Sequence, residues 1–207
     1  MKRRTYIISV FALAAAAVCG LTGSSTARAD ASGCKLGPLS QPFLPWADPG
    51  SYGLLPNGGF EQGTSSWSFD GSARVAAGNE SFFVSGDNDS RALSLGGSGS
   101  ATSDDVCVTL GSPTLRLFAR NSGSPLSALG VSAQFIDAGG REQTVPIAVI
   151  VAGSDWQPTV PIPIDVNLLD LPILSDGSSS VAFTFQPLGF GGDWSIDDVY
   201  LDPFKTN

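Results

Sequence analysis

The sequence contains no histidine, which removes several kinds of catalytic and metal site. Without histidine there is no Ser-His-Asp or Cys-His unit to activate a nucleophile, and the thiolates of Cys34 and Cys107 alone do not complete a tetrahedral zinc shell. A glycosidase needs two carboxylates flanking one bond; Glu61, Glu80 and Glu142 are present, but their spacing selects no pair. No glycine-rich phosphate loop occurs. We therefore expect a protein that is not an enzyme.

Positive charge is also scarce. The chain has 11 Lys and Arg against 19 Asp and Glu, giving a formal net charge of −8. Nucleic acid binding needs a basic surface, so nucleic acid is not an expected partner. The one long apolar run, Ile7 to Val18, is shorter than the roughly 20 residues that span a bilayer, so we expect no membrane anchor.

The first 29 residues have the pattern of a secretory signal peptide. Lys2, Arg3 and Arg4 precede the apolar run, and Ala27-Arg28-Ala29 is a small-x-small cleavage site. Cys19 offers a lipoprotein alternative, but the branched Val18 before it disfavours that processing. Cleavage would remove four basic residues and no acid, taking the charge to −12 and leaving 178 residues. We expect a secreted, extracellular protein.

Two cysteines remain after cleavage, Cys34 and Cys107, and outside the cell they are expected to form a disulfide. Closing a loop of 73 residues would stabilise the fold by about 4 kcal/mol on the chain-entropy model. The alternative is two free, buried thiols.

The mature chain divides into two parts. Residues 30–53 are rich in proline and glycine yet contain Phe43, Trp46 and Tyr52, so we expect an irregular arm packed along the domain. Residues 54–207 alternate short apolar-polar runs with Gly, Ser, Asp and Asn, which predicts an all-β sandwich of two antiparallel sheets. The expected strands are 59–62, 66–69, 74–76, 92–95, 100–110, 114–121, 129–137, 142–151, 159–164, 181–186 and 194–201.

The strand expected at residues 194–201 closes this sandwich. Apolar alternation runs through Trp194, Ile196, Val199 and Tyr200 but changes phase at Asp197-Asp198. This change predicts a β-bulge that turns the carboxylates out of the core.

Several motifs in order resemble the jelly-roll carbohydrate-binding modules, families four, nine and twenty-two in style. They are Leu55-Pro56-Asn57-Gly58-Gly59-Phe60-Glu61 followed by Trp67, Ser90 to Leu95, Phe135 to Gly140, Trp156-Gln157-Pro158 and the closing strand. The resemblance implies a galactose-binding-like fold. Phe43-Leu44-Pro45-Trp46 and Asp104-Asp105-Val106-Cys107 are also similar to a group of secreted actinobacterial proteins with no assigned activity.

The resemblance further implies a structural calcium ion between the Asn-x-x-Phe-Glu strand and the closing strand. The matching ligands are Glu61 and Asp198, with Asp197 less certain and Asp87 and Asp89 as further candidates. Calcium binds six to eight oxygens, so carbonyls or waters would complete the shell. The alternative is that Glu61 and Asp198 cap turns or face solvent.

Side-chain alternation along three expected strands predicts a ligand-binding face. If these strands are neighbours, one face collects planar polar groups around an aromatic ring, which suits a sugar. Its residues are Arg116, Phe118, Arg120, Gln134, Thr184 and Gln186. The alternative is that the arm covers the face and that Arg116 pairs with an acid such as Asp137.

The sequence thus favours a secreted, non-catalytic module that binds carbohydrate. The competing hypothesis is an extracellular structural or protein-interaction module. A sugar site should show a groove with Phe118 accessible and the arginines unpaired. An interaction module should show a flat apolar patch, with Phe82 and Phe83 as candidates, or an arm over the face.

Overall fold

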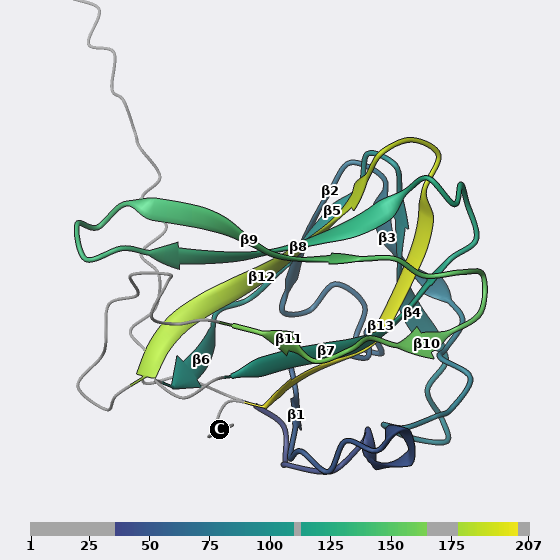
Figure 1. The fold of residues 1–207 in the computed structure, drawn as a ribbon, viewed down its shortest axis with the longest axis horizontal. Helices are drawn as coiled ribbons and strands as arrows, with labels where there is room; N and C mark the ends of the chain where they lie inside the picture. The colour runs from purple at the N-terminus through teal and green to yellow at the C-terminus, as the bar shows by residue number, and fades with distance from the viewer. Residues whose placement is uncertain (1–35, 110–112, 165–177, 203–207) are drawn as a thin grey trace, which may run out of the picture.

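The computed structural model describes residues 36–109, 113–164 and 178–202, which form a sandwich of two antiparallel sheets (Figure 1). In the first, here called the β7 sheet, the order is β10-β7-β13-β4-β3, with β1 beside β13 and β11 beside β7. In the second, the β8 sheet, the order is β2-β5-β12-β8-β9, with β6 beside β12. The predicted fold class is confirmed.

The strand bounds follow the predicted alternation closely. The β7 sheet contains β1 (Gly53–Leu54), β3 (Ala73–Ala77), β4 (Arg91–Gly96), β7 (Thr114–Asn121), β10 (Gln157–Pro158), β11 (Ile162–Pro163) and β13 (Asp193–Asp202). The β8 sheet contains β2 (Trp67–Asp70), β5 (Ser100–Ser103), β6 (Val106–Thr109), β8 (Ala128–Ile136), β9 (Glu142–Ile150) and β12 (Ser178–Leu188).

The core lies between the sheets, where alternate residues of each strand meet. Leu115 and Leu117 of β7 pack in one cluster with Phe183 and Phe185 of β12, all fully buried. Each such side chain stabilises the fold by roughly 1.5–3 kcal/mol through burial. Trp67, Trp156 and Trp194 are buried as well, as packing residues.

Three expected strands differ from the structure. The run 100–110 is two strands, because β5 ends at Ser103 and β6 begins at Val106. The run 159–164 supplies only the two-residue β11, preceded by the equally short β10. Proline supplies no amide hydrogen, and Pro158, Pro161 and Pro163 interrupt this edge. Residues 59–62 form turns instead of a strand.

The turn at 59–62 has a local cause in the side chain of Asn57. Its Oδ1 accepts the amide hydrogen of Gln62 at 2.9 Å, and its Nδ2 donates to the carbonyls of Gly63 and Ser65. Asn57 and Phe60 both adopt positive φ, at 51° and 61°. An asparagine that bonds to its own neighbouring backbone favours a turn over a strand.

The predicted bulge is present in β13, where the register against β7 shifts between Asp197 and Tyr200. Asp198 has φ of 50°, in the left-handed region. Asp197 is paired with Phe118 on the outer face, outside the core between the sheets, but both carboxylates are fully buried because the loop before β4 covers them.

Residues 36–52, here called the arm, lie along the outer face of the β7 sheet (Figure 1). A bridge joins Ser40 to Tyr52, and Leu44–Trp46 form one 3-10 turn. Among the described residues no helix is long and apolar enough to cross a membrane. The signal peptide and Cys34 lie outside the described residues, so secretion and the Cys34–Cys107 disulfide stay predictions.

Candidate functional site

The arm covers part of the face predicted to bind a ligand. Phe118 of β7 is fully buried. The ring of Phe43 stacks on it at 5.5 Å between centroids, and the rings of Trp46 and Phe82 lie at 5.4 and 5.6 Å. Phe118 is therefore a packing residue, and its predicted role as an accessible sugar-stacking ring is wrong. An arm over this face is the outcome expected for the interaction module.

Arg116, two residues before Phe118, fixes the arm by a buried ion pair. Its Nη1 lies 2.6 Å from Oδ2 of Asp48, and its Nε and Nη2 donate to the carbonyl of Thr159 at 2.9 and 2.5 Å. The guanidinium also lies over the ring of Phe43, 4.0 Å from the centroid. The predicted alternative partner Asp137 instead pairs with Arg141.

Asp48 is held as a carboxylate by its neighbours. Burial alone would raise its pKa, but hydrogen bonds from the Tyr52 hydroxyl, the Gly50 amide and Arg116 lower the pKa below its usual value. The same burial, with the bond to Asp48, raises the pKa of Tyr52. Asp48 therefore stays ionised near neutral pH and forms a charged, hydrogen-bonded pair with Arg116.

The six predicted ligand residues do not share one face. Arg116, Phe118 and Arg120 lie on β7, whereas Gln134 lies on β8 and Thr184 and Gln186 on β12. These strands belong to opposite sheets, so the prediction of a common face is wrong. Side-chain alternation gave the correct faces; the assumed strand neighbours were incorrect.

Two grooves flank the segment that carries β10 and β11. The first, here called the arm groove, has a volume of about 480 Å³ and is lined by Trp46, Ala47, Asp48, Arg116 and residues 157–161. The second, about 370 Å³, lies toward β9 and is walled mainly by Ala148, Val149, Val151 and Ile162. Gln157 lines both grooves, and of the two the arm groove adds an indole and a charged pair.

Sequence reasoning did not identify Trp46, Asp48 or Gln157 as ligand-binding residues. Trp46 and Asp48 belong to the arm, which was expected only to pack, and Gln157 lies on a two-residue strand. A usable signal was the cluster Pro45-Trp46-Ala47-Asp48, an aromatic and an acid in a segment too irregular to be core.

A second polar cluster is buried beneath the loop before β4. The amide of Glu80 donates to Oδ2 of Asp197 at 2.9 Å, and the amide of Asp198 donates to Oδ1 of Asp197 at 2.9 Å. Ser85 donates its hydroxyl to Oδ1 of Asp198 at 2.6 Å and also contacts Asp89. Among the described residues, no arginine or lysine pairs with these acids.

Burial and mutual repulsion change the ionisation of this cluster. Burial, followed by the neighbouring Asp198, raises the pKa of Asp197 to about 9. Burial raises the pKa of Asp198 to about 7, with Glu80 and Asp89 contributing repulsion. Tyr200 also has a raised pKa, first from burial and then from Asp198.

One carboxylate oxygen of this acidic cluster is available to bind a cation. Oδ2 of Asp198 is buried and has no hydrogen-bond partner, and Glu80 and Asp89 add negative charge nearby. Glu61 has another role: its carboxylate accepts the amides of Ser90 and Arg91, both at 2.7 Å, at the start of β4. Within the described ranges no three acids or cysteines are grouped as a metal site. Backbone carbonyls and waters would have to supply most calcium ligands.

No protein-family model matches this sequence, and no curated protein is significantly similar to it. Solved structures do match. The tandem domain CBM22-1-CBM22-2 of Paenibacillus barcinonensis Xyn10C aligns with a TM-score of 0.51 and 14% identity, over 74% of this chain and 46% of that chain. Its single CBM22-1 xylan-binding domain aligns with a TM-score of 0.49 and 14% identity, over 72% and 93%.

A catalytic protein is also among the matches. The enzymatically active domain of tailspike protein 4 from bacteriophage CBA120 aligns with a TM-score of 0.51 and 13% identity, over 72% of this chain and 21% of that chain. This chain therefore spans about a fifth of the tailspike chain and less than half of the tandem domain. At these identities the similarity shows the fold alone, a jelly-roll β-sandwich of the kind found in carbohydrate-binding modules.

Proposed function

We infer that this protein is a secreted, non-catalytic carbohydrate-binding module whose ligand lies in the arm groove. The observation that carries the proposal is the lining of that groove, where the half-buried Trp46 lies beside Asp48, Arg116 and Gln157. Its volume of about 480 Å³ is in the usual range for small-ligand sites. Structural similarity to carbohydrate-binding modules supports the same function.

The groove has the chemistry that a sugar ring requires. The apolar face of a pyranose packs on an aromatic ring, and its hydroxyl pairs bond to planar amide, guanidinium and carboxylate groups. Trp46 supplies the indole, and Gln157, which is exposed, supplies a free amide. Asp48 and Arg116 are positioned by each other before any ligand arrives, so little ordering entropy is lost on binding.

The same groove does not favour hydrolysis. Glycosidases use two carboxylates, one of them protonated near neutral pH. Asp48 is the one acid among the described residues lining the arm groove, and its pKa is lowered, so it stays ionised. This supports a binding module over an enzyme.

Retention on insoluble polysaccharides and peptidoglycan tests the proposal. Wild-type protein should be retained by at least one polysaccharide, and Gln157→Ala or Trp46→Ala should weaken retention about tenfold or more, through the lost hydrogen bond or stacking surface. Phe190→Ala is the matched control, because Phe190 is an exposed ring outside the groove. The exposed Gln157 side chain makes no hydrogen bond to any residue that the structure describes, so its variant should keep the wild-type melting temperature. Retention that neither variant changes would exclude the arm groove.

A second candidate function rests on Phe82 and Phe83, which are 43% and 46% exposed. Phe83 adopts φ of 52°, a conformation that costs free energy for a bulky residue. An exposed aromatic pair on a strained loop is a feature of protein-contact surfaces. Phe83→Ser with no loss of sugar retention, but loss of a protein partner, would favour the interaction module.

Calcium is proposed as a structural ion at Asp198, with Glu61 as the ligand implied by family resemblance. Removing calcium with a chelator should lower the melting temperature, equivalent to about 2.7 kcal/mol if calcium was at a hundredfold excess over its dissociation constant. Asp198→Asn should abolish this shift, and Glu61→Gln should abolish it only if Glu61 binds the ion. A melting temperature unaffected by chelator in all three proteins would remove calcium from the account.

A further inference from the structure

One row of residues crosses four strands of the β7 sheet. Arg74 of β3 is paired with Ser94 of β4, Ser94 with Ser195 of β13, and Ser195 with Arg120 of β7. Directly paired residues of antiparallel strands project from the same face. Arg120 is two residues beyond Phe118, so the row lies on the outer face, next to the part that the arm covers.

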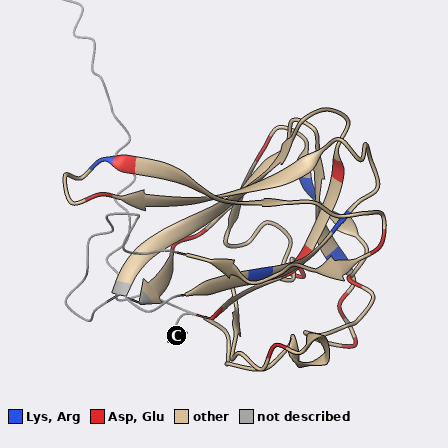
Figure 2. Ribbon diagram, in the orientation of Figure 1, with Lys and Arg blue, Asp and Glu red and all other residues tan. Residues whose placement is uncertain are grey.

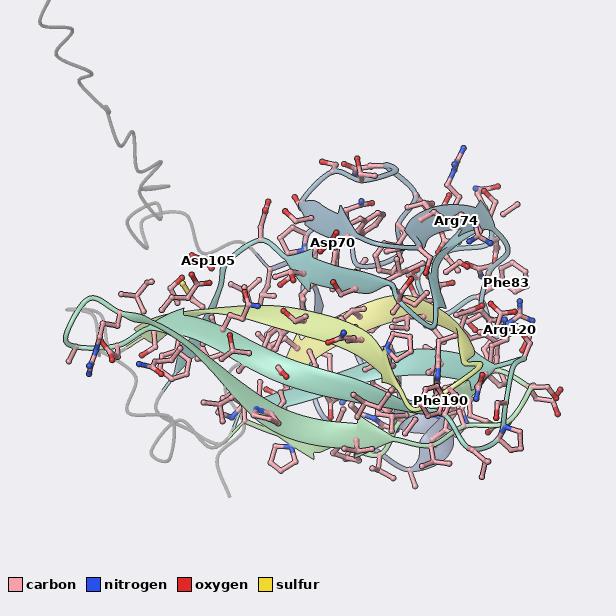
Figure 3. All side chains as sticks on the ribbon, turned by 90° about the horizontal axis from the view of Figure 1, so that it is seen from above. Asp70, Arg74, Phe83, Asp105, Arg120 and Phe190 are labelled. Atoms are coloured by element: carbon pink, nitrogen blue, oxygen red, sulfur yellow. The ribbon has the colours of Figure 1, made fainter. Side chains whose placement is uncertain are left out.

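Positive charge gathers toward this part of the sandwich. In Figure 2 the blue segments lie on the β7 sheet and at one end of the molecule, apart from one at the β8–β9 hairpin. Figure 3 shows Arg74 and Arg120 at the same end, opposite Asp105. Around them the protein is acidic, with a formal net charge of −8.

Neither arginine of the row has an ion-pair or hydrogen-bond partner among the described residues. Arg116 and Arg141 form ion pairs, whereas Arg74 and Arg120 make no ion pair or side-chain hydrogen bond. The Nε of Arg120 is buried without a hydrogen-bond partner. Trp156 holds the guanidinium in place, 4.9 Å below it. The contact with Trp156 orients the guanidinium, and no described residue accepts a hydrogen bond from its side chain.

The two acids that flank Ser195 on the same face of β13 form no ion pair with the arginines of the row and make other contacts. Asp193 precedes Ser195 by two residues and accepts the hydroxyl of Ser122 at 2.8 Å. Asp197 follows Ser195 by two residues and accepts the amides of Glu80 and Asp198. The two guanidinium groups remain available to a ligand.

We propose that this row binds the carboxylates of an acidic polysaccharide, a polymer of uronic acids. Guanidinium pairs with carboxylate through two parallel hydrogen bonds. Between the arginines the partly exposed Ser195 can bond to a sugar hydroxyl, whereas Ser94 is buried. Three inter-strand spacings of about 4.8 Å separate the arginine backbones by about 14 Å, longer than one sugar ring. The ligand is therefore a chain with more than one charged residue. This inference rests on the proposed carbohydrate-binding function.

Affinity electrophoresis with polygalacturonate, and with its methyl ester as the uncharged equivalent, tests the row. Wild-type protein should bind polygalacturonate at least about tenfold more tightly than the ester, and Arg120→Gln or Arg74→Gln should each lose about tenfold, the effect of one charge-assisted contact. Arg91→Gln is the matched control, because Arg91 is exposed, also unpaired and outside the row. Arg74 is exposed, so its variant should fold normally.

The results distinguish acidic-polysaccharide binding by the row from carbohydrate binding in the arm groove. If polygalacturonate and its methyl ester bind equally, or if Arg74→Gln and Arg120→Gln leave binding unchanged, the proposed role of the row is contradicted. Equally tight binding of poly-L-glutamate would show recognition of charge alone and would also overturn it. If only neutral polysaccharides retain the protein, and Gln157→Ala weakens that retention, carbohydrate binding in the arm groove is supported and acidic-polysaccharide binding by the row is contradicted. No retention by any polysaccharide would contradict both.

Discussion

Arg116→Leu should lower the free energy of unfolding by about 3–5 kcal/mol, the usual cost of removing one partner of a buried ion pair. Leucine replaces much of the aliphatic stem, but Asp48 loses its cation at 2.6 Å and the Thr159 carbonyl loses two donors. Urea unfolding followed by tryptophan fluorescence measures the change.

The matched control is Arg141→Leu. Arg141 also pairs with an aspartate, at 3.3 Å from Asp137, but its side chain is 79% exposed, so its loss should cost less than about 1 kcal/mol. A double-mutant cycle of Arg116→Leu with Asp48→Asn should show a coupling of more than about 1 kcal/mol. Similar losses for Arg116→Leu and Arg141→Leu would mean that the arm is not fixed by a buried pair.

Metal-free protein should become more stable as the pH falls from about 8 to about 5. The pKa of Asp197 is raised by burial to about 9 and that of Asp198 to about 7, from an ordinary 3.8. At a pH between the pKa of a carboxyl in the unfolded chain and its higher pKa in the folded chain, the folded chain holds a proton that the unfolded chain has lost. Stability is therefore fully present below about pH 4 and falls, by up to about 1.4 kcal/mol per pH unit for each carboxyl, as the pH rises through this window.

Thermal melting in chelator across pH 5 to 8 measures this dependence. Asp198→Asn should reduce the dependence of the melting temperature on pH below about pH 7. Asp104→Asn, a substitution at an exposed residue, should leave that dependence unchanged. Added calcium should raise the melting temperature more at pH 8 than at pH 5, because an ion favours the ionised carboxyl. A melting temperature that rises with pH, without metal, would show that the buried acids are ionised at little cost.

The sequence was sufficient to predict most of the fold because the strands are patterned by burial. Along β8 buried and partly exposed residues alternate. Along β7 the alternate residues Leu115, Leu117 and Ala119 point into the core, although the arm buries part of the other face as well, so strand positions and faces are local properties. The bulge at Asp197-Asp198 was also visible as a change of phase. Failures occurred where one side chain or proline decided the backbone, as at Asn57 and Pro158.

The candidate site was harder to predict because it depends on which strands are neighbours. Gln134 and Thr184 were assigned to the face of Arg116, but they belong to the opposite sheet. No local pattern encodes that choice, which is made by long-range pairing. Asp48 lies 68 residues from Arg116, and the pair that shapes the arm groove appears only when the arm is folded onto β7.

NMR titration of the tryptophan indole and glutamine side-chain signals with oligosaccharides tests whether a sugar binds in the arm groove. The Trp46 indole and the Gln157 amide should shift together and saturably, while the indole of Trp194, fully buried and bonded to Ser127, should not shift. Saturable shifts confined to Gln134 and Gln186, or no shift with any neutral or acidic oligosaccharide, would contradict sugar binding in the arm groove.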